Sequence, residues 1–431
     1  MDFIDFELRA WQADAAHVQV LVHSSPAGDM RQPVTVPFDA AGLEAFRAIF
    51  GDRAAGAPVV NWSDLIAGGQ QLAATLLPSP VYSLLNRSLD HISPDAGLRV
   101  RLCLDGALVD LPWECLYRPD AAGQRPSAGF LALDSRISLV RGAPSRLIGT
   151  SPTRRQQRLL FAGAPFMVRG EDWWGVEPER EKLLAALQPV SDLLSVESVT
   201  GAQTSFEAAL ARSPADIFHY SGHTEAPADG AGFLVEDMRV DPTDDPRYIV
   251  WRHPNYERQY GTDRLYLDMM YVAHLGDLLR RAGTKLAVFS ACNSGRWPFV
   301  EPLLDAGLPV VIGTQGWLAY PAAVPFFHKL YGALAIGLSL DEAVTWARLH
   351  LLEPTTLAER WRWQWAMFMV YMPTPEAVLF PKPKQAGVRE RQAAARRERM
   401  QTIINVYQNI GTVQGGQVVG VSADQIGGGT T

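Results

Sequence analysis

Hydrophobic residues from position 157 onward gather in short apolar runs, separated by stretches with helical periodicity. Runs that are apolar on both faces are typical of strands in a parallel sheet, because helices cover both sides of such a sheet. The predicted strands are 159–164, 195–200, 217–220, 285–291 and 308–312, and the predicted helices are 178–187, 205–212, 274–282, 297–306, 321–337 and 340–352. The pattern therefore predicts an α/β fold with a mostly parallel sheet and helices on both faces.

Residues 1–155 follow a different pattern, in which Val, Ile and Leu alternate with polar residues. Alternation of this kind indicates strands with one face on a core. Predicted strands lie at 3–9, 17–23, 98–104 and 137–140, and predicted helices at 40–50 and 65–77. We predict a smaller β-rich N-terminal region over 1–155, followed by the main α/β domain over 156–380.

Three further segments interrupt this organisation. Residues 237–264 are rich in Asp, Pro, Arg and Tyr. A loop of that length is often functional, so we interpret it either as a lid beside a site or as a plain surface excursion. Residues 381–402 form a basic linker with a helix-forming run, and residues 403–431 form a glycine-rich tail.

Composition narrows the class of protein. The chain has 431 residues, of which 47% are hydrophobic and 20% charged, which suffices for a large core. The net charge of −7 argues against coating nucleic acid or anionic lipid. Three cysteines without Cys-x-x-Cys spacing argue against a disulfide framework and a structural zinc site. With neither a signal-peptide pattern nor an apolar run of about 18 residues, we expect a cytoplasmic protein with no nucleic-acid or membrane partner.

Two predicted strand ends carry reactive side chains. Parallel sheets place functional groups just past the carboxyl ends of their strands. One such end holds His219 and His223, and the other holds Cys292, followed by small residues of the kind expected where backbone approaches a ligand. Alone, a cysteine at a strand end is more often a core residue, and a histidine there is more often a turn residue. Together they fit a cysteine nucleophile with an imidazole base.

The order of motifs along the chain resembles the CHAT domain, a caspase-like module of the clan CD cysteine peptidases. The resemblance is carried by HYSGH at 219–223 and SACNSG at 290–295, and it extends to LPWE at 111–114, GLPVVIG at 307–313 and a closing strand at 367–372. It covers about residues 6 to 380. The resemblance implies a caspase-like fold, with residues 156–380 as the catalytic domain.

The resemblance also implies roles for individual residues. Cys292 would be the nucleophile that forms a thioester, and His223 the base that takes the thiol proton. The backbone N–H groups of Cys292 and Thr224 would bind the oxyanion; Thr224 stands where the family usually has glycine, which weakens this expectation. We expect His219 to point into a layer of helices, and Glu114 to belong to a packed turn. No metal or cofactor motif is present, so we expect neither.

The substrate pocket is less defined. Ser290 stands where some relatives with basic specificity carry aspartate, so its neutral side chain argues against a pocket for arginine or lysine at that point. Gln315 and Trp317 border the substrate groove by resemblance, although a core role for Trp317 is equally consistent with the sequence. Three residues at or just before the start of the interrupting segment are further candidates: Glu236, Asp237 and Arg239.

The tail suggests a second function. Residues 411–415 and 416–420 are approximate mirror images, and they are uncharged, proline-free and contain Gln and Val, which suits in-register stacking. They resemble the pseudo-palindromic amyloid signalling motifs of immune effectors, which pair an effector with a sensor. This predicts self-association through 405–426 and a sensor or adaptor with a similar motif; the alternative is a disordered glycine-rich tail.

Two functions from different classes remain. The first is a cytoplasmic cysteine endopeptidase acting on a protein substrate, an effector in bacterial defence or regulated cell death that induced proximity activates. The second is a catalytically inactive caspase-like scaffold, recruited through its tail, in which Cys292 and His223 serve only as packing residues.

Overall fold

The structure of the chain is a computed structural model. It describes residues 2–51, 60–120, 126–142, 156–168, 171–172, 175–226, 232–239, 248–251 and 265–373. The predictions for the basic linker at 381–402 and for the tail at 403–431 lie outside the described residues.

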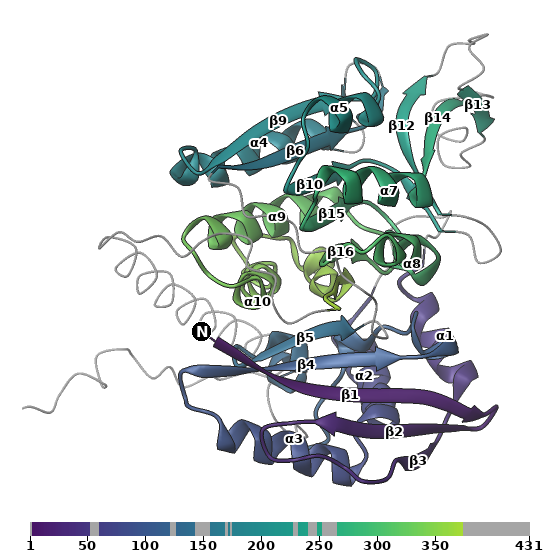
Figure 1. Cartoon of the computed structure of the whole chain (residues 1–431). Coiled ribbons are helices and arrows are strands. Elements are labelled where there is room, and N and C mark those ends of the chain that lie inside the picture. The colour runs from purple at the N-terminus through teal and green to yellow at the C-terminus, as the bar shows by residue number, and fades with distance from the viewer. Residues whose placement is uncertain are drawn as a thin grey trace, which may run out of the picture.

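In the described part of the chain, eleven strands form one large sheet that extends from β9 at the top of Figure 1 to β3 at the bottom. Its order is β3-β2-β1-β4-β5-β17-β16-β15-β10-β6-β9. Most neighbouring pairs are parallel; β1–β2, β2–β3 and β16–β17 are antiparallel. The strands are β1 (Asp2–Asp14), β2 (His17–Ser24), β3 (Val34–Pro37), β4 (Ala96–Leu104), β5 (Ile137–Gly142), β6 (Gln157–Gly163), β9 (Leu194–Thr200), β10 (Ile217–Ser221), β15 (Leu286–Ser290), β16 (Val311–Thr314) and β17 (Phe368–Tyr371).

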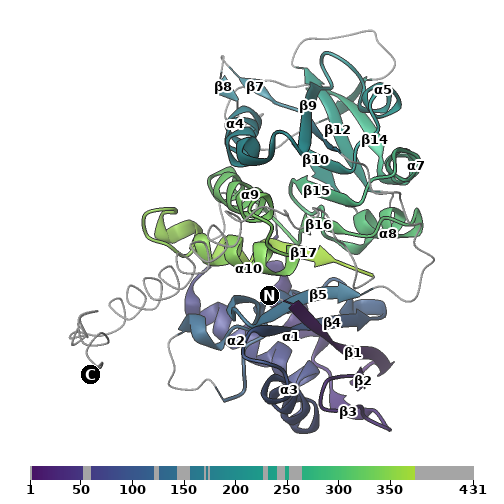
Figure 2. The same ribbon diagram turned by 60° about the vertical axis from the view of Figure 1, so that its left-hand side comes forward.

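Helices cover both faces of this sheet, as the sequence predicted (Figure 2). One face carries α4 (Val176–Leu187), α9 (Tyr320–Ala335) and α10 (Leu340–His350), and the other carries α5 (Phe206–Arg212), α7 (Val272–Ala282) and α8 (Trp297–Asp305). The two layers enclose separate apolar cores, because successive side chains of each strand point to opposite faces. The predicted α/β fold class is confirmed.

The N-terminal region contributes β1 to β5 together with three helices, α1 (Ala40–Ala48), α2 (Trp62–Leu76) and α3 (Ser79–His91). The sequence predicted that the preceding helix ends before Pro78 and did not predict α3, whose second proline is Pro80. In the structure both prolines stand at the start of α3, where a missing N–H leaves no hydrogen bond unmade. β5 lies next to β17 through the pair Arg141 and Tyr371, so one sheet joins the N-terminal region to the rest.

The interrupting segment is partly a sheet of its own. β11 (Thr224–Glu225), β12 (Phe233–Arg239), β14 (Leu265–Tyr271) and β13 (Tyr248–Trp251) pair in that order as antiparallel strands. The interpretation of 237–264 as a loop is therefore wrong for 237–239 and 248–251. The residues between those strands lie outside the described ranges, so a lid stays a prediction.

Shorter elements complete the described chain. A two-stranded ribbon joins β7 (Met167–Val168) to β8 (Glu171–Asp172). Short 3₁₀ segments occur at Gly106–Leu108, Trp113–Cys115, Pro126–Gly129, Leu131–Leu133, Gln188–Val190 and Glu359–Met367. Among the helices described, none combines the length and the apolar character needed to cross a membrane.

The LPWE block is a packed turn, as predicted. Glu114 and Arg141 form a bidentate ion pair, with contacts of 2.6 Å and 3.1 Å, and both side chains are almost completely buried. Arg141 also donates to the carbonyls of Val109 and Leu111. The pair thus anchors the turn to β5 and keeps Glu114 in the interior.

Candidate active site

The register of two neighbouring strands brings His223 and Cys292 to the same edge of the sheet. β10 and β15 are parallel, and their last residues, Ser221 and Ser290, are opposite each other. His223 and Cys292 each follow two residues later. The backbone N–H of Gly222 donates to the carbonyl of Ser290 at 3.3 Å, so the two chain segments remain adjacent beyond the strands. This juxtaposition agrees with the one expected from the sequence.

Hydrogen bonds fix the backbone around His223. Its carbonyl accepts the N–H of Val235 at 3.0 Å and lies 2.7 Å from the phenolic oxygen of Tyr220. A Cβ at Gly222 would lie 2.5 Å from that same phenolic oxygen, so the approach of Tyr220 requires glycine there. The His223 loop is therefore tied to β12 of the small sheet.

A carboxylate that the sequence reasoning missed lies beside the His223 ring. Oε1 of Glu225 is 3.3 Å from Nε2 of His223. The imidazole is 12% exposed and the Glu225 side chain 37% exposed, so the carboxylate is the more accessible member of the pair. The available signal was the spacing of two residues, which in an extended segment puts both side chains on the same side.

The sulfur of Cys292 accepts a hydrogen bond from the backbone N–H of Leu318 at 3.3 Å. Leu318 belongs to the loop between β16 and α9, and a backbone donor of this kind leaves no signature in the sequence. Asn293 has a φ of 57°, in the left-handed region, and its N–H donates to the carbonyl of Gly316 at 3.0 Å. This sharp turn directs the chain away immediately after the half-buried cysteine.

The small residues after Cys292 serve packing. The Ser294 hydroxyl donates to the carbonyl of Ala291 at 2.7 Å and accepts the N–H of Thr314 at 3.1 Å. A Cβ at Gly295 would lie 2.6 Å from the sulfur of Met369 and 3.0 Å from the nitrogen of Thr314. These residues let the turn pack against β16 and β17, and the approach of a ligand to the backbone here stays a prediction.

His219 is part of the interior, as predicted. Its side chain is fully buried, with Nε2 2.8 Å from a carboxylate oxygen of Glu179 on α4 and Nδ1 3.0 Å from the hydroxyl of Tyr331 on α9. The ring therefore faces the helical layer and lies away from the edge that carries His223.

The residues predicted to line the substrate pocket have different surroundings. Ser290 is 6% exposed and its hydroxyl donates to Glu179 at 2.7 Å. Gln315 is 4% exposed and donates to the carbonyl of Ala366 at 2.8 Å. Trp317 is half-buried, with its ring 5.5 Å from that of Trp361. Of the three, Trp317 presents the most surface.

The candidates around the start of the interrupting segment are internal where they are described. Glu236 is buried, and its carboxylate accepts the backbone N–H of Phe206 at 2.7 Å, at the start of α5. Asp237 is buried as well. Glu236 thus stabilises a helix terminus, which is a favourable place for a negative charge.

A family comparison agrees with these motifs. The model of the CHAT domain matches residues 67–373, a range that includes the LPWE, HYSGH and SACNSG blocks. The chain belongs to the CHAT domain family. This family is one of caspase-like proteases, and the match begins within α2, later than the resemblance read from the sequence.

Comparison with solved structures finds distant similarity to this CHAT protein. Two crystal structures of the Saccharomyces cerevisiae separase–securin complex match it with TM-scores of 0.37 and 0.36, at 15% and 14% identity. Each match covers 78% of this chain but 20% of the matched chain, so the CHAT protein spans about a fifth of that length. A comparison with curated protein sequences found no match.

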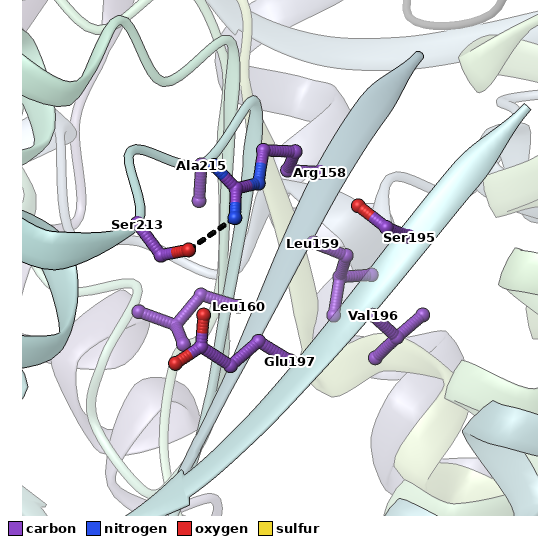
Figure 3. A pocket seen from close by; sticks show the side chains of 8 residues that line it. All are labelled: Arg158, Leu159, Leu160, Ser195, Val196, Glu197, Ser213 and Ala215. Carbon is purple, nitrogen blue, oxygen red and sulfur yellow. Dashed lines mark hydrogen bonds between the residues drawn. The ribbon is translucent and has the colours of Figure 1, made fainter.

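A small pocket of the CHAT protein lies at the opposite edge of the sheet. Figure 3 shows the side chains around a cavity of about 150 Å³, where Arg158 donates to the hydroxyl of Ser213. The lining residues precede β10 or belong to the first halves of β6 and β9: Arg158, Leu159, Leu160, Ser195, Val196, Glu197, Ser213 and Ala215. These residues lie toward the amino ends of the strands, whereas parallel sheets bind ligands at the carboxyl ends. The cavity is therefore separate from the candidate active site.

The other two cysteines of the CHAT protein have unreactive surroundings. Burial raises the pKa of the Cys103 thiol to about 11. Complete burial, with the Glu114 carboxylate nearby, raises the pKa of the Cys115 thiol well above its usual range. Since the thiolate is the attacking species, neither residue is suited to nucleophilic catalysis.

Proposed function

We propose that this CHAT protein is a cysteine endopeptidase in which Cys292 is the nucleophile and His223 the general base. The observation that carries the proposal is the register of β10 and β15, which places both residues two positions past the paired Ser221 and Ser290. The hydrogen bond from Leu318 to the Cys292 sulfur supports it further, since a donor at that position favours the thiolate.

The reaction follows from these groups. His223 takes the thiol proton, and the sulfur attacks the scissile carbonyl carbon to give a tetrahedral oxyanion. The backbone N–H groups of Cys292 and Thr224 would bind this oxyanion. Collapse breaks the C–N bond, and His223 returns the proton to the leaving amine. The remaining thioester is hydrolysed by water, with His223 again as base, which releases the acid and restores the thiol.

Identification of new protein N-termini tests this function. We expect cells that express the wild-type chain to accumulate N-termini that are missing with Cys292→Ala and with His223→Ala. Expression levels and thermal unfolding of the three proteins should agree, which removes misfolding as a cause. Identical N-termini with wild type and Cys292→Ala would contradict the endopeptidase and favour the scaffold.

The proposed biological setting is a cytoplasmic effector in bacterial defence or regulated cell death. The mirror-image sequence in residues 405–426 supports recruitment by a sensor or adaptor with a similar motif, followed by self-association and activation through proximity. Deletion of residues 403–431 should leave basal cleavage intact and abolish activation by the trigger. Unchanged activation of the truncated chain would rule out this role for the tail.

A further inference from the structure

A buried carboxylate lies beneath the strand ends that precede the candidate catalytic residues. Glu179 on α4 is 3% exposed. One of its oxygens accepts the hydroxyls of Ser290 at 2.7 Å and Ser221 at 3.0 Å, and the other lies 2.8 Å from Nε2 of His219. The hydroxyl of Tyr331 completes the network at 3.0 Å from Nδ1 of His219.

The network bridges two strands at one level of the sheet. His219 and Ser221 lie on the same face of β10 because they are two residues apart. Ser290 is opposite Ser221 on β15, so a single carboxylate holds the last residue of both strands. His223 and Cys292 each follow these strand ends by two residues. Glu179 therefore contacts the two strand ends from which both residues extend.

Stability alone does not account for this arrangement. Transferring a carboxylate from water to the interior costs several kcal/mol even after relaxation, and well-packed apolar residues often replace buried charges without loss. The surroundings are apolar, with the ring of Phe161 stacked on His219 at 5.2 Å and that of Phe327 edge-on at 5.0 Å. Fully connected polar networks do, however, fix a single geometry.

We propose that Glu179 is a positioning residue for the Cys292–His223 pair. Through Ser221 and Ser290 it sets the relative height of β10 and β15, and thereby the approach of the imidazole to the sulfur. A displacement of about 1 Å between reacting groups costs on the order of 10² in rate, so a side chain that touches no substrate can still govern turnover. This inference rests on the proposed function.

The test uses the full-length chain and a readout that needs no known substrate. The rate at which iodoacetamide alkylates Cys292 is followed by mass spectrometry between pH 5.5 and 9, in wild type and in His223→Ala. We expect Glu179→Leu to lose the His223-dependent part of the rate, a reduction of tenfold or more. Glu179→Gln should recover most of it, because its amide accepts from His219 and donates to a serine oxygen.

Two further variants sharpen the result. Glu177→Gln makes the same chemical change as Glu179→Gln on the same helix, at a half-buried residue paired with Arg180, and should alkylate at the wild-type rate. Ser221→Ala combined with Ser290→Ala removes the bridge without altering the charge and should reproduce Glu179→Leu. With a cleavable peptide, kcat should fall about 10²-fold while KM stays within about twofold, a split that general loss of structure would not give.

The outcomes distinguish a failure of the Glu179 inference from a failure of the proposed Cys292–His223 pair. If Glu179→Leu folds with a wild-type urea midpoint and alkylates at the wild-type rate, Glu179 positions nothing. If Glu179→Leu fails to fold, the double serine variant decides, and a wild-type rate there overturns the inference. If His223→Ala leaves alkylation of Cys292 unchanged, the proposed catalytic pair itself is wrong.

Discussion

The hydroxyl of Thr224 donates a hydrogen bond to the backbone carbonyl of Cys292. The residue after the candidate base is thereby linked directly to the candidate nucleophile, across a gap in sequence of 68 residues. The sequence indicated that a side chain at Thr224 would weaken the oxyanion site, because the family usually has glycine there. The structure adds a role for that side chain, since glycine has no hydroxyl to make this link.

Thr224 therefore offers a sharp substitution. Thr224→Val keeps the shape of the side chain but removes its hydroxyl. The carbonyl of Cys292 then loses this hydrogen bond, next to a side chain that is fully buried. We expect a loss of about 1–2 kcal/mol in the free energy of unfolding and a reduced rate of cleavage or alkylation. Thr224→Ser keeps the hydroxyl and should stay close to wild type. Urea unfolding and Cys292 alkylation measure both effects, and equal behaviour of the two variants would contradict the role of the hydroxyl.

The three cysteines should react selectively. With the pKa of Cys103 near 11, about one part in a thousand of that thiol is ionised at pH 8, and its thiolate fraction grows only as the pH rises toward that value. Burial makes Cys115 slower still, because its pKa is raised and its side chain is inaccessible. We expect iodoacetamide at pH 7–8 to modify Cys292 first. Peptide mass spectrometry measures the labelling of each position, and equal labelling of all three would argue for the scaffold.

The left-handed backbone at Asn293 predicts which substitutions there are tolerated and which destabilise the fold. Asn293→Gly should be tolerated, since glycine adopts a φ of 57° without strain. Asn293→Val should destabilise the fold by at least about 1–2 kcal/mol and lower the alkylation rate of Cys292, because a β-branched residue resists this conformation. The midpoint of urea unfolding, together with the alkylation rate, tests this order. A more stable valine variant would show that the turn relaxes.

The buried pair of Glu114 and Arg141 predicts a non-additive result. Arg141→Met leaves a carboxylate in the interior without its partner and should cost about 3–5 kcal/mol in the free energy of unfolding. Adding Glu114→Leu removes the stranded charge and should restore part of that loss. Denaturant titration of the two single variants and the double variant gives the coupling energy, and simple additivity would contradict the ion pair.

Local patterns sufficed to predict the strands that carry the site. β10 and β15 are short apolar runs that end in small or polar residues, and the expectation that parallel strands share an active edge then brought His223 and Cys292 together. The burial of His219 followed from its position inside an apolar strand. These features depend on neighbours in sequence or on general rules of sheets.

Other features depend on contacts between distant residues. Glu179 lies 40 residues before His219 and 111 before Ser290, and its position on α4 resembles that of any acidic residue in a first helical turn. Leu318 contributes a backbone N–H, which any residue except proline supplies. The strands β12 to β14 are largely apolar, but they were missed because the Asp-, Pro- and Arg-rich stretch between and around them was interpreted as one loop.

The placement of β17 has a consequence for assembly. β17 is flanked by β16 on one side and by β5 on the other, so the half of the sheet that carries the candidate site ends against the chain's own N-terminal strands. A second copy that extended this sheet would have to attach at β9 or β3, the outermost strands in its described part. If whole molecules cluster, the clustering would then act by raising their local concentration. It would not have to supply a strand beside the Cys292 thiol, because the strands on both sides of β15 come from the same chain.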